Sequence, residues 1–268
     1  MNSEVLDIVK NMCLFDDTFM SKVFENNIEC TQLIVNIILG REDIIVKDVK
    51  TQFTNQTIVG KESALDVYAV DSEGRPINIE VQRNDIGASR KRARYYSSLI
   101  DTYNLYPKQK YDELPESYVI FITENDVLRQ GLPVYKIDRV IEQTGEKFGD
   151  GSHIVYVNGS YRGNDDLGKL MFDFSQKTAD NIYFEKIKDR VKYLKNEKEG
   201  VNEMCALVEE YAERKAAAVR AEGRAEGRAE GRAEGSIAAL DKLLNEGLIS
   251  AEVYLKTKNE IINPVSAQ

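Results

Sequence analysis

The stretch Ser63–Gln82, SALDVYAVDSEGRPINIEVQ, decides the fold. In both of its halves apolar residues recur at odd positions: Leu65, Val67, Ala69, Ile77, Ile79 and Val81. Successive side chains of a strand point to opposite faces, so this alternation predicts two strands that share one apolar face. The sequence DSEGR between them is rich in turn residues, and Gly74 readily adopts a positive φ. The stretch therefore predicts a β-hairpin.

The length of the turn fixes the register of this hairpin. If residues 71–75 form the loop, Val70 pairs with Pro76 and Asp66 lies opposite Glu80. Side chains in that relation are about 4.5–5.5 Å apart at Cβ, where like charges repel. A divalent cation explains the arrangement, because Mg²⁺ binds through one or two carboxylates plus water and phosphate. The solvated face of an amphipathic hairpin explains it equally well, and the spacing alone does not decide.

A basic helix is predicted after the hairpin, from about residue 87 to residue 106. Its apolar stripe consists of Tyr96, Leu99, Ile100 and Tyr103. Arg92 falls on the same stripe, and arginine is rarely buried without a partner, so we expect it to pair with a site carboxylate or a phosphate. The segment 83–94 has one acidic residue and five basic ones, namely Arg83, Arg90, Lys91, Arg92 and Arg94. In a chain of net charge −9, nucleic-acid contact would have to use such a local patch.

The hairpin and the helix together carry a family resemblance. Asp66, a turn and then Glu80-Val81-Gln82 resemble the signature of the PD-(D/E)XK nuclease fold, with Gln82 where most families have lysine. This Glu-x-Gln variant, followed by the basic segment Arg92–Tyr96, resembles the PD-(D/E)XK nuclease transposase family, also called recombination-promoting nucleases. The resemblance covers about residues 15–174.

The resemblance implies an α/β fold with a restriction-endonuclease-like αβββαβ core and a mixed central sheet. It also implies a metal-dependent DNA endonuclease that hydrolyses phosphodiester bonds and is linked to recombination or mobile elements. Asp66, Glu80 and the Val81 carbonyl would hold Mg²⁺, for which Mn²⁺ would substitute, and Gln82 would orient the attacking water. Related folds add an acid from the first helical region, for which Glu25 and Glu29 are candidates, although a solvated glutamate is the commoner role for either.

Two alternatives of other classes stay open. A nuclease-like fold with a silent site would act as a DNA-binding module through the basic helix. An oligomeric scaffold would act through C-terminal helices.

Features outside the hairpin indicate the compartment. The three cysteines, at positions 13, 30 and 205, show neither disulfide nor zinc spacing and fit a reducing cytosol. The N-terminus lacks signal-peptide features, and the longest apolar run, residues 33–39, is too short for a membrane span. We therefore expect a cytoplasmic protein that does not bind membranes. The single histidine, His153, is expected to be structural.

The rest of residues 1–180 should complete the nuclease-like domain. Helices are expected from Asp16 or Asp17 and over about residues 27–39, where Gly40 ends the second one. Strands are expected over residues 44–49, 51–59, 117–123, 134–141 and 154–157.

A helical C-terminal extension is predicted from residue 181, where the composition becomes charged. A charged helical segment at 181–219 leads into four Arg-Ala-Glu-Gly repeats at 220–235. The repeats form either a marginal helix, which an antiparallel copy of the chain would stabilise through facing arginine and glutamate ridges, or a flexible linker. A small helical hairpin follows at 236–264, with Ser236 expected to cap its first helix.

Overall fold

The computed structural model describes residues 3–55, 63–83 and 85–262. The chain divides into two compact units, residues 1–208 and 209–268. The first unit contains the hairpin, and it continues beyond residue 180, where the composition changes.

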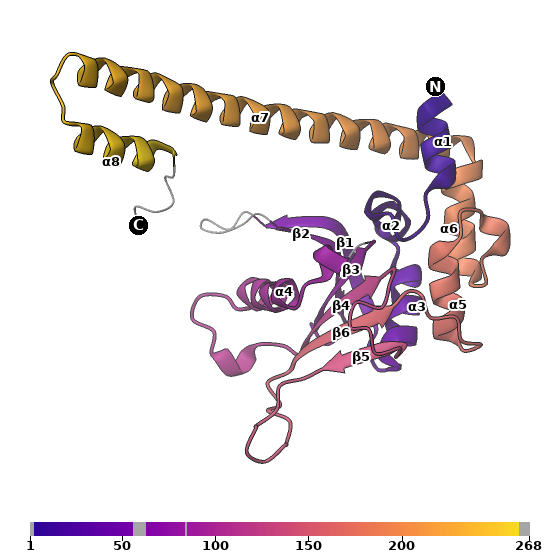
Figure 1. Ribbon diagram of the computed structural model, residues 1–268. Helices are drawn as coiled ribbons and strands as arrows, with labels where there is room; N and C mark the ends of the chain where they lie inside the picture. Colours follow the sequence, from indigo (N-terminus) through magenta and orange to yellow (C-terminus); the bar gives the residue numbers. More distant parts are fainter. Residues whose placement is uncertain (1–2, 56–62, 84, 263–268) are drawn as a thin grey trace. The chain divides into compact units, whose positions relative to one another are not determined.

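A six-stranded mixed sheet forms the centre of the first unit, in the order β1-β2-β3-β4-β6-β5 (Figure 1). The pairs β1/β2, β2/β3 and β5/β6 are antiparallel, whereas β3/β4 and β4/β6 are parallel. The expected α/β architecture and αβββαβ core are confirmed, and β4 is buried along its whole length. The strands are β1 Val46–Asn55, β2 Ser63–Asp71, β3 Pro76–Gln82, β4 Ser117–Thr123, β5 Val134–Ile137 and β6 Ser152–Asn158.

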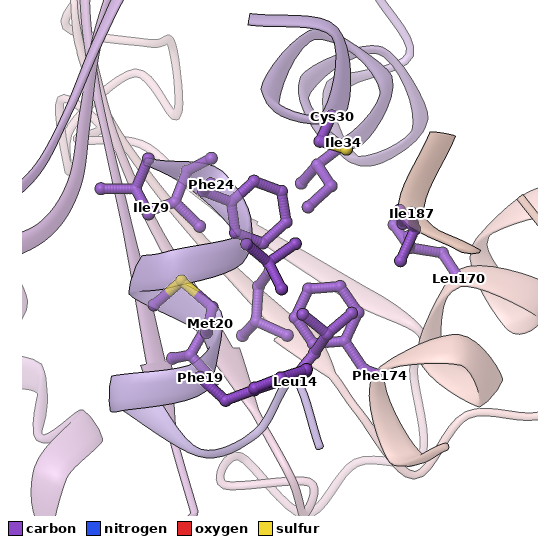
Figure 2. Close-up of a cluster of buried hydrophobic side chains, with 14 of the residues drawn as sticks. Leu14, Phe19, Met20, Phe24, Cys30, Ile34, Ile79, Leu170, Phe174 and Ile187 are labelled. Atoms are coloured by element: carbon purple, nitrogen blue, oxygen red, sulfur yellow. The ribbon is translucent and has the colours of Figure 1, made fainter. Parts of the chain in front are cut away.

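Helices cover both faces of this sheet. One face carries the larger core, to which α1 Ser3–Asn11, α2 Asp17–Phe24, α3 Ile28–Leu39, α5 Asp166–Ser175 and α6 Glu185–Asn196 contribute. Figure 2 shows part of this core, where the rings of Phe19, Phe24 and Phe174 lie among aliphatic side chains. The other face carries α4, Arg90–Asn104, over a smaller cluster rich in aromatic residues. The sheet is therefore buried on both sides, and the polar site described below lies on the α4 side.

The hairpin has the expected register at its turn, where Val70 pairs with Pro76. Gly74 takes φ +80°, and its turn is closed by hydrogen bonds that the buried Asp71 accepts from backbone N–H groups. The prediction that all six apolar residues share one face is wrong for Leu65, which packs in the cluster on the α4 side. The β2–β3 ladder ends at Val67, and Leu65 pairs instead with Phe53 of β1, whose ring also packs on the α4 side.

Elements near the hairpin differ in detail from the prediction. Helix α1 was not predicted, although Val5 and Val9 are spaced for one buried helical face. The two strands expected at 44–49 and 51–59 form the single strand β1, with a register shift between Val46 and Asp48; residues 56–59 of that prediction lie outside the described residues. The expected strand at 134–141 ends at residue 137. The basic helix begins at residue 90, after a short 3-10 helix at residues 85–88.

The second unit is helical. Helix α7, Lys198–Asn245, begins in the first unit and runs through all four Arg-Ala-Glu-Gly repeats, so the repeats are helical rather than a linker. Ser236 lies inside this helix, and its predicted role as a cap is wrong. The helix ends at Asn245. Just beyond it Gly247 takes φ +68°, and the N–H groups of residues 247 and 248 bond back to the carbonyls of residues 244 and 243. Helix α8 is Ala251–Ile262.

The second unit has no interior of its own in its described part, because no described side chain beyond Val208 is buried. Among the helices that the structure describes, none has the length and hydropathy needed to cross a bilayer.

Candidate active site

The site is built around two buried carboxylates at the point where β2 and β3 separate. The exposed fraction is 7% for Asp66 of β2 and 0% for Glu80 of β3. Oδ2 of Asp66 accepts a hydrogen bond of 3.1 Å from the Val81 N–H, and Oε1 of Glu80 accepts one of 3.2 Å from the Asp66 N–H. The β2–β3 ladder ends at the pair Val67–Ile79, and beyond it the two carboxylates accept hydrogen bonds from backbone N–H groups of the opposite strand. These hydrogen bonds hold the two side chains beside each other.

Burial makes this pair electrostatically strained. Desolvation raises the pKa of Asp66 and of Glu80, because the buried position disfavours the charged form. The charge of Asp66 raises the pKa of Glu80 further, while the hydrogen bond from Asn78 opposes the shift. A cation between the two groups would favour their ionised forms.

Arg92 of α4 places a positive charge beside the two carboxylates. Its Nη2 lies 3.4 Å from Oε2 of Glu80. Its Nε and Nη2 donate shorter hydrogen bonds, of 2.8 and 2.6 Å, to the hydroxyl oxygen of Tyr96. The arginine side chain is 36% exposed, so one guanidinium faces both the carboxylates and the solvent.

Two groups of β3 complete the candidate donor set. Carbonyls of successive strand residues point to opposite edges. The Gln82 carbonyl accepts from the Glu124 N–H, just beyond β4, so the Val81 carbonyl points to the β2 edge, where Asp66 lies. The Gln82 side chain extends over Gly87, where an added Cβ would lie 1.8 Å from its Oε1. The absence of a side chain at residue 87 therefore makes room for the Gln82 amide.

The predicted nucleic-acid contacts divide into two groups. Arg90, Lys91 and Arg94 are exposed on the first turns of α4, next to Arg92. Arg83 forms the second group, because it contacts a different part of the chain. Its Nη2 donates to Oδ2 of Asp16 at 2.9 Å and to the Cys13 sulfur at 3.2 Å.

The two candidate accessory acids have partners of their own. Glu25 pairs with Lys22 at 2.5 Å, and Glu29, whose side chain is 75% exposed, lies 3.6 Å from Lys186. The acid of this region that acts on the pair is Asp17, whose charge raises the pKa of Asp66.

Three residues near the pair were not predicted as site residues. These are Asp17, Asn78 and Tyr96, and the sequence contains a signal from which each could have been predicted. Asp17 begins the first predicted helix, Asn78 shares the polar strand face of Glu80, and Tyr96 follows Arg92 by one helical turn. Asn78 is fully buried; its amide nitrogen donates to Oε1 of Glu80 at 3.0 Å, and its Oδ1 has no partner within the described part of the chain.

The donor set fits a hard divalent cation. No three His, Cys, Asp or Glu side chains converge as a metal site within residues 3–55, 63–83 and 85–262. Asp66, Glu80 and the Val81 carbonyl offer oxygen donors, and Mg²⁺ takes only one or two carboxylates when water and phosphate fill its other positions. The residues present are therefore suited to Mg²⁺ or Mn²⁺.

A mixed sheet of this topology, with an Asp/Glu pair on separating strands, defines a protein of the PD-(D/E)XK nuclease fold. The chain belongs to the PD-(D/E)XK nuclease family transposases, whose family model matches residues 21–228. The match includes the site from Asp66 to Tyr96, begins after Asp17, and extends beyond residue 174 into α7. Neither the comparison with curated proteins nor the comparison with solved structures gave a match.

Proposed function

We propose that the protein is a Mg²⁺-dependent DNA endonuclease that hydrolyses phosphodiester bonds in recombination or in the movement of mobile elements. The observation that supports this function best is the Asp66–Glu80 pair, two buried carboxylates held together by backbone hydrogen bonds. Burying two carboxylates side by side destabilises the fold, because both lose their hydration and their like charges repel. A buried salt bridge has an attraction between opposite charges that offsets such a cost, and a purely structural pair of carboxylates has none. Membership of a nuclease family supports the same function.

Asp66, Glu80 and the Val81 carbonyl would hold the cation, either Mg²⁺ or Mn²⁺. When bound, such a cation lowers the pKa of a coordinated water and neutralises charge that develops on the phosphate. The two carboxylates would act as ligands of this cation, and the hydrogen bonds from Asn78 and the Val81 N–H keep their oxygens oriented.

The other residues of the site bind and orient the reactants. The Gln82 amide would hydrogen-bond the attacking water; it acts neither as a cation nor as a base. Arg92 would bind the scissile phosphate with its planar fork, a geometry that lysine does not offer. The exposed side chains of Arg90, Lys91 and Arg94, with Arg83 nearby in sequence, would bind the DNA backbone.

Cleavage of supercoiled plasmid by the purified protein tests this function. The wild type should nick or linearise the plasmid with Mg²⁺ or Mn²⁺ and should not do so with EDTA, and Asp66→Ala should not cut in either condition. Cutting by Asp66→Ala at the wild-type rate would refute the assignment. If the wild type does not cut, a mobility shift with Ca²⁺ distinguishes the silent DNA-binding module, which shifts DNA, from the scaffold, which does not.

We also propose that the second unit associates with a second copy of the chain. Its two helices and the segment between them expose a set of large apolar side chains while no described residue of the unit is buried: Leu243, Leu248, Val253, Leu255 and Ile262. Its charges are mixed, which disfavours a polyanionic partner. Light scattering after gel filtration should give a multiple of the chain mass for the wild type and the monomer mass for Leu248→Asp/Leu255→Asp. Val140→Asp, at an equally exposed apolar residue of the first unit, is the matched control.

A further inference from the structure

The Arg92 guanidinium is held more closely by a tyrosine than by the carboxylate it faces. Its Nε and Nη2 lie 2.8 and 2.6 Å from the Tyr96 oxygen, against 3.4 Å from Nη2 to Oε2 of Glu80. The carbon at the centre of the guanidinium is also 5.1 Å from the centre of the Tyr96 ring. A contact of 3.4 Å is at the long end for a charge-assisted hydrogen bond, so the phenol is the main anchor of this arginine.

Tyr96 is itself fixed by packing. It is 2% exposed and lies on the inward stripe of α4, with its ring stacked on that of Phe121 of β4 at 6.1 Å between centres. Burial and the nearby Glu80 charge raise the pKa of the phenol, so it stays a neutral hydroxyl whose oxygen accepts from the arginine. The sheet therefore sets the position of the acceptor, and the acceptor sets the position of the guanidinium.

The arginine and a bound cation would compete for the same carboxylate. A guanidinium paired fully with Oε2 of Glu80 would satisfy the charge that draws a cation to the site, and it would turn its donors away from an incoming phosphate. A guanidinium held by the Tyr96 hydroxyl instead leaves that oxygen without a close cationic partner.

We propose that Tyr96 is a positioning residue that holds Arg92 beside Glu80 rather than on it. This leaves the Glu80 carboxylate without a close cationic partner, so that a metal cation can pair with it, and it directs the arginine toward the phosphate of the substrate. The functional benefit of this arrangement rests on the proposed nuclease function. The effect of Tyr96 on the position of Arg92 can be measured whether or not the protein is a nuclease.

The test uses Tyr96→Phe, with Tyr156→Phe as a matched control. Tyr156 is also buried, stacks on Phe121 and donates a hydrogen bond of 3.0 Å to the Ala88 carbonyl, so its loss removes a comparable hydroxyl without touching Arg92. The first readout is water exchange of the Arg92 Nε–H by NMR in the full-length metal-free protein, with the resonance assigned by its loss in Arg92→Lys. Exchange should be at least about tenfold faster in Tyr96→Phe, because Nε loses its hydrogen bond to the phenol oxygen, and unchanged in Tyr156→Phe.

The second readout is the Ca²⁺ concentration that half-saturates a thermal shift. It should rise about tenfold in Tyr96→Phe, because Nη2 of the released arginine closes on Glu80 while Nε is left without its acceptor, and it should stay unchanged in Tyr156→Phe. Adding Arg92→Ala to Tyr96→Phe should restore cation binding, which a merely structural role of the phenol does not predict.

The outcomes are separable. Unchanged Nε–H exchange in Tyr96→Phe overturns the proposal, whatever the protein does to DNA. Faster exchange with unaltered Ca²⁺ affinity overturns the competition between arginine and cation. A wild type that binds no cation refutes the proposed function, and the NMR comparison alone then decides whether Tyr96 positions Arg92.

Discussion

Replacing Asp66 by asparagine should stabilise the metal-free protein, even though it alters a buried, hydrogen-bonded residue. The asparagine keeps the shape of the side chain and an oxygen that accepts from the Val81 N–H. It removes a buried charge that faces Glu80 and Asp17. Each unit by which burial raises a carboxyl pKa corresponds to about 1.4 kcal/mol, and Arg92 offsets part of this, so we expect a net gain of about 1–3 kcal/mol.

The effect should depend on pH in a fixed direction. Because the folded-state pKa of Asp66 is raised, its contribution to stability is complete below the ordinary carboxyl pKa and is lost as pH rises through the raised value. Asparagine does not titrate, so the gap between variant and wild type should be only partly developed at about pH 5 and should widen toward about pH 8.5. At the higher pH the melting temperature of Asp66→Asn should exceed that of the wild type by about 2–12 °C for a domain of this size.

Thermal unfolding in EDTA, followed by circular dichroism at both pH values, measures this gap. Asp71→Asn is the control on the same strand, because Asp71 is also buried but pairs with Arg75 at 2.6 Å. Breaking that pair should destabilise the protein by about 2–4 kcal/mol, the opposite sign. A destabilised Asp66→Asn protein at high pH, or a gap that does not change with pH, would refute the view that the pair is strained in the absence of a cation.

Three further predictions concern catalysis and DNA binding. Arg92→Ala should lower the cleavage rate by about a hundredfold or more while weakening DNA binding only modestly, and Arg92→Lys should rescue little; a variant that melts earlier but cuts normally when folded would show a purely structural arginine. Gln82→Lys should retain or raise cleavage in a plasmid assay, because it adds a cation beside the phosphate, and complete loss would reveal a specific role of the amide hydrogen bond. Neutralising Lys91 or Arg94 should weaken DNA binding and reduce the slope of log affinity against log salt by about one unit per residue, and an unchanged slope would exclude that backbone contact.

The hairpin and its consequences were predictable because they depend on local rules. Alternation over Ser63–Gln82 gave the strands, and Gly74 gave the turn, which together set the pairing of Val70 with Pro76. The side of the sheet on which Leu65 packs was predicted wrongly, because it depends on the point at which β2 separates from β3. That point is a property of the whole sheet and not of the local sequence.

The site was predictable only in part, for the same reason. Helical periodicity placed Arg92 on the inward stripe with Tyr96, where the structure has it. The choice of acid from the first helices depends on how α2 docks on the sheet. The family resemblance implied an acid from this region, and the candidates named for it were Glu25 and Glu29 rather than Asp17. The state of the Arg-Ala-Glu-Gly repeats was also undecided, since glycine propensity and helical period favour opposite outcomes, and the structure has them in α7.

The position of Mn²⁺ in crystals of the wild-type protein tests the central claim most directly. Anomalous scattering should place one ion between the carboxylates of Asp66 and Glu80 and the Val81 carbonyl, and the same soak of Asp66→Ala should show no ion there. Fully occupied Mn²⁺ elsewhere on the wild-type protein, with none between these two carboxylates, would contradict the account.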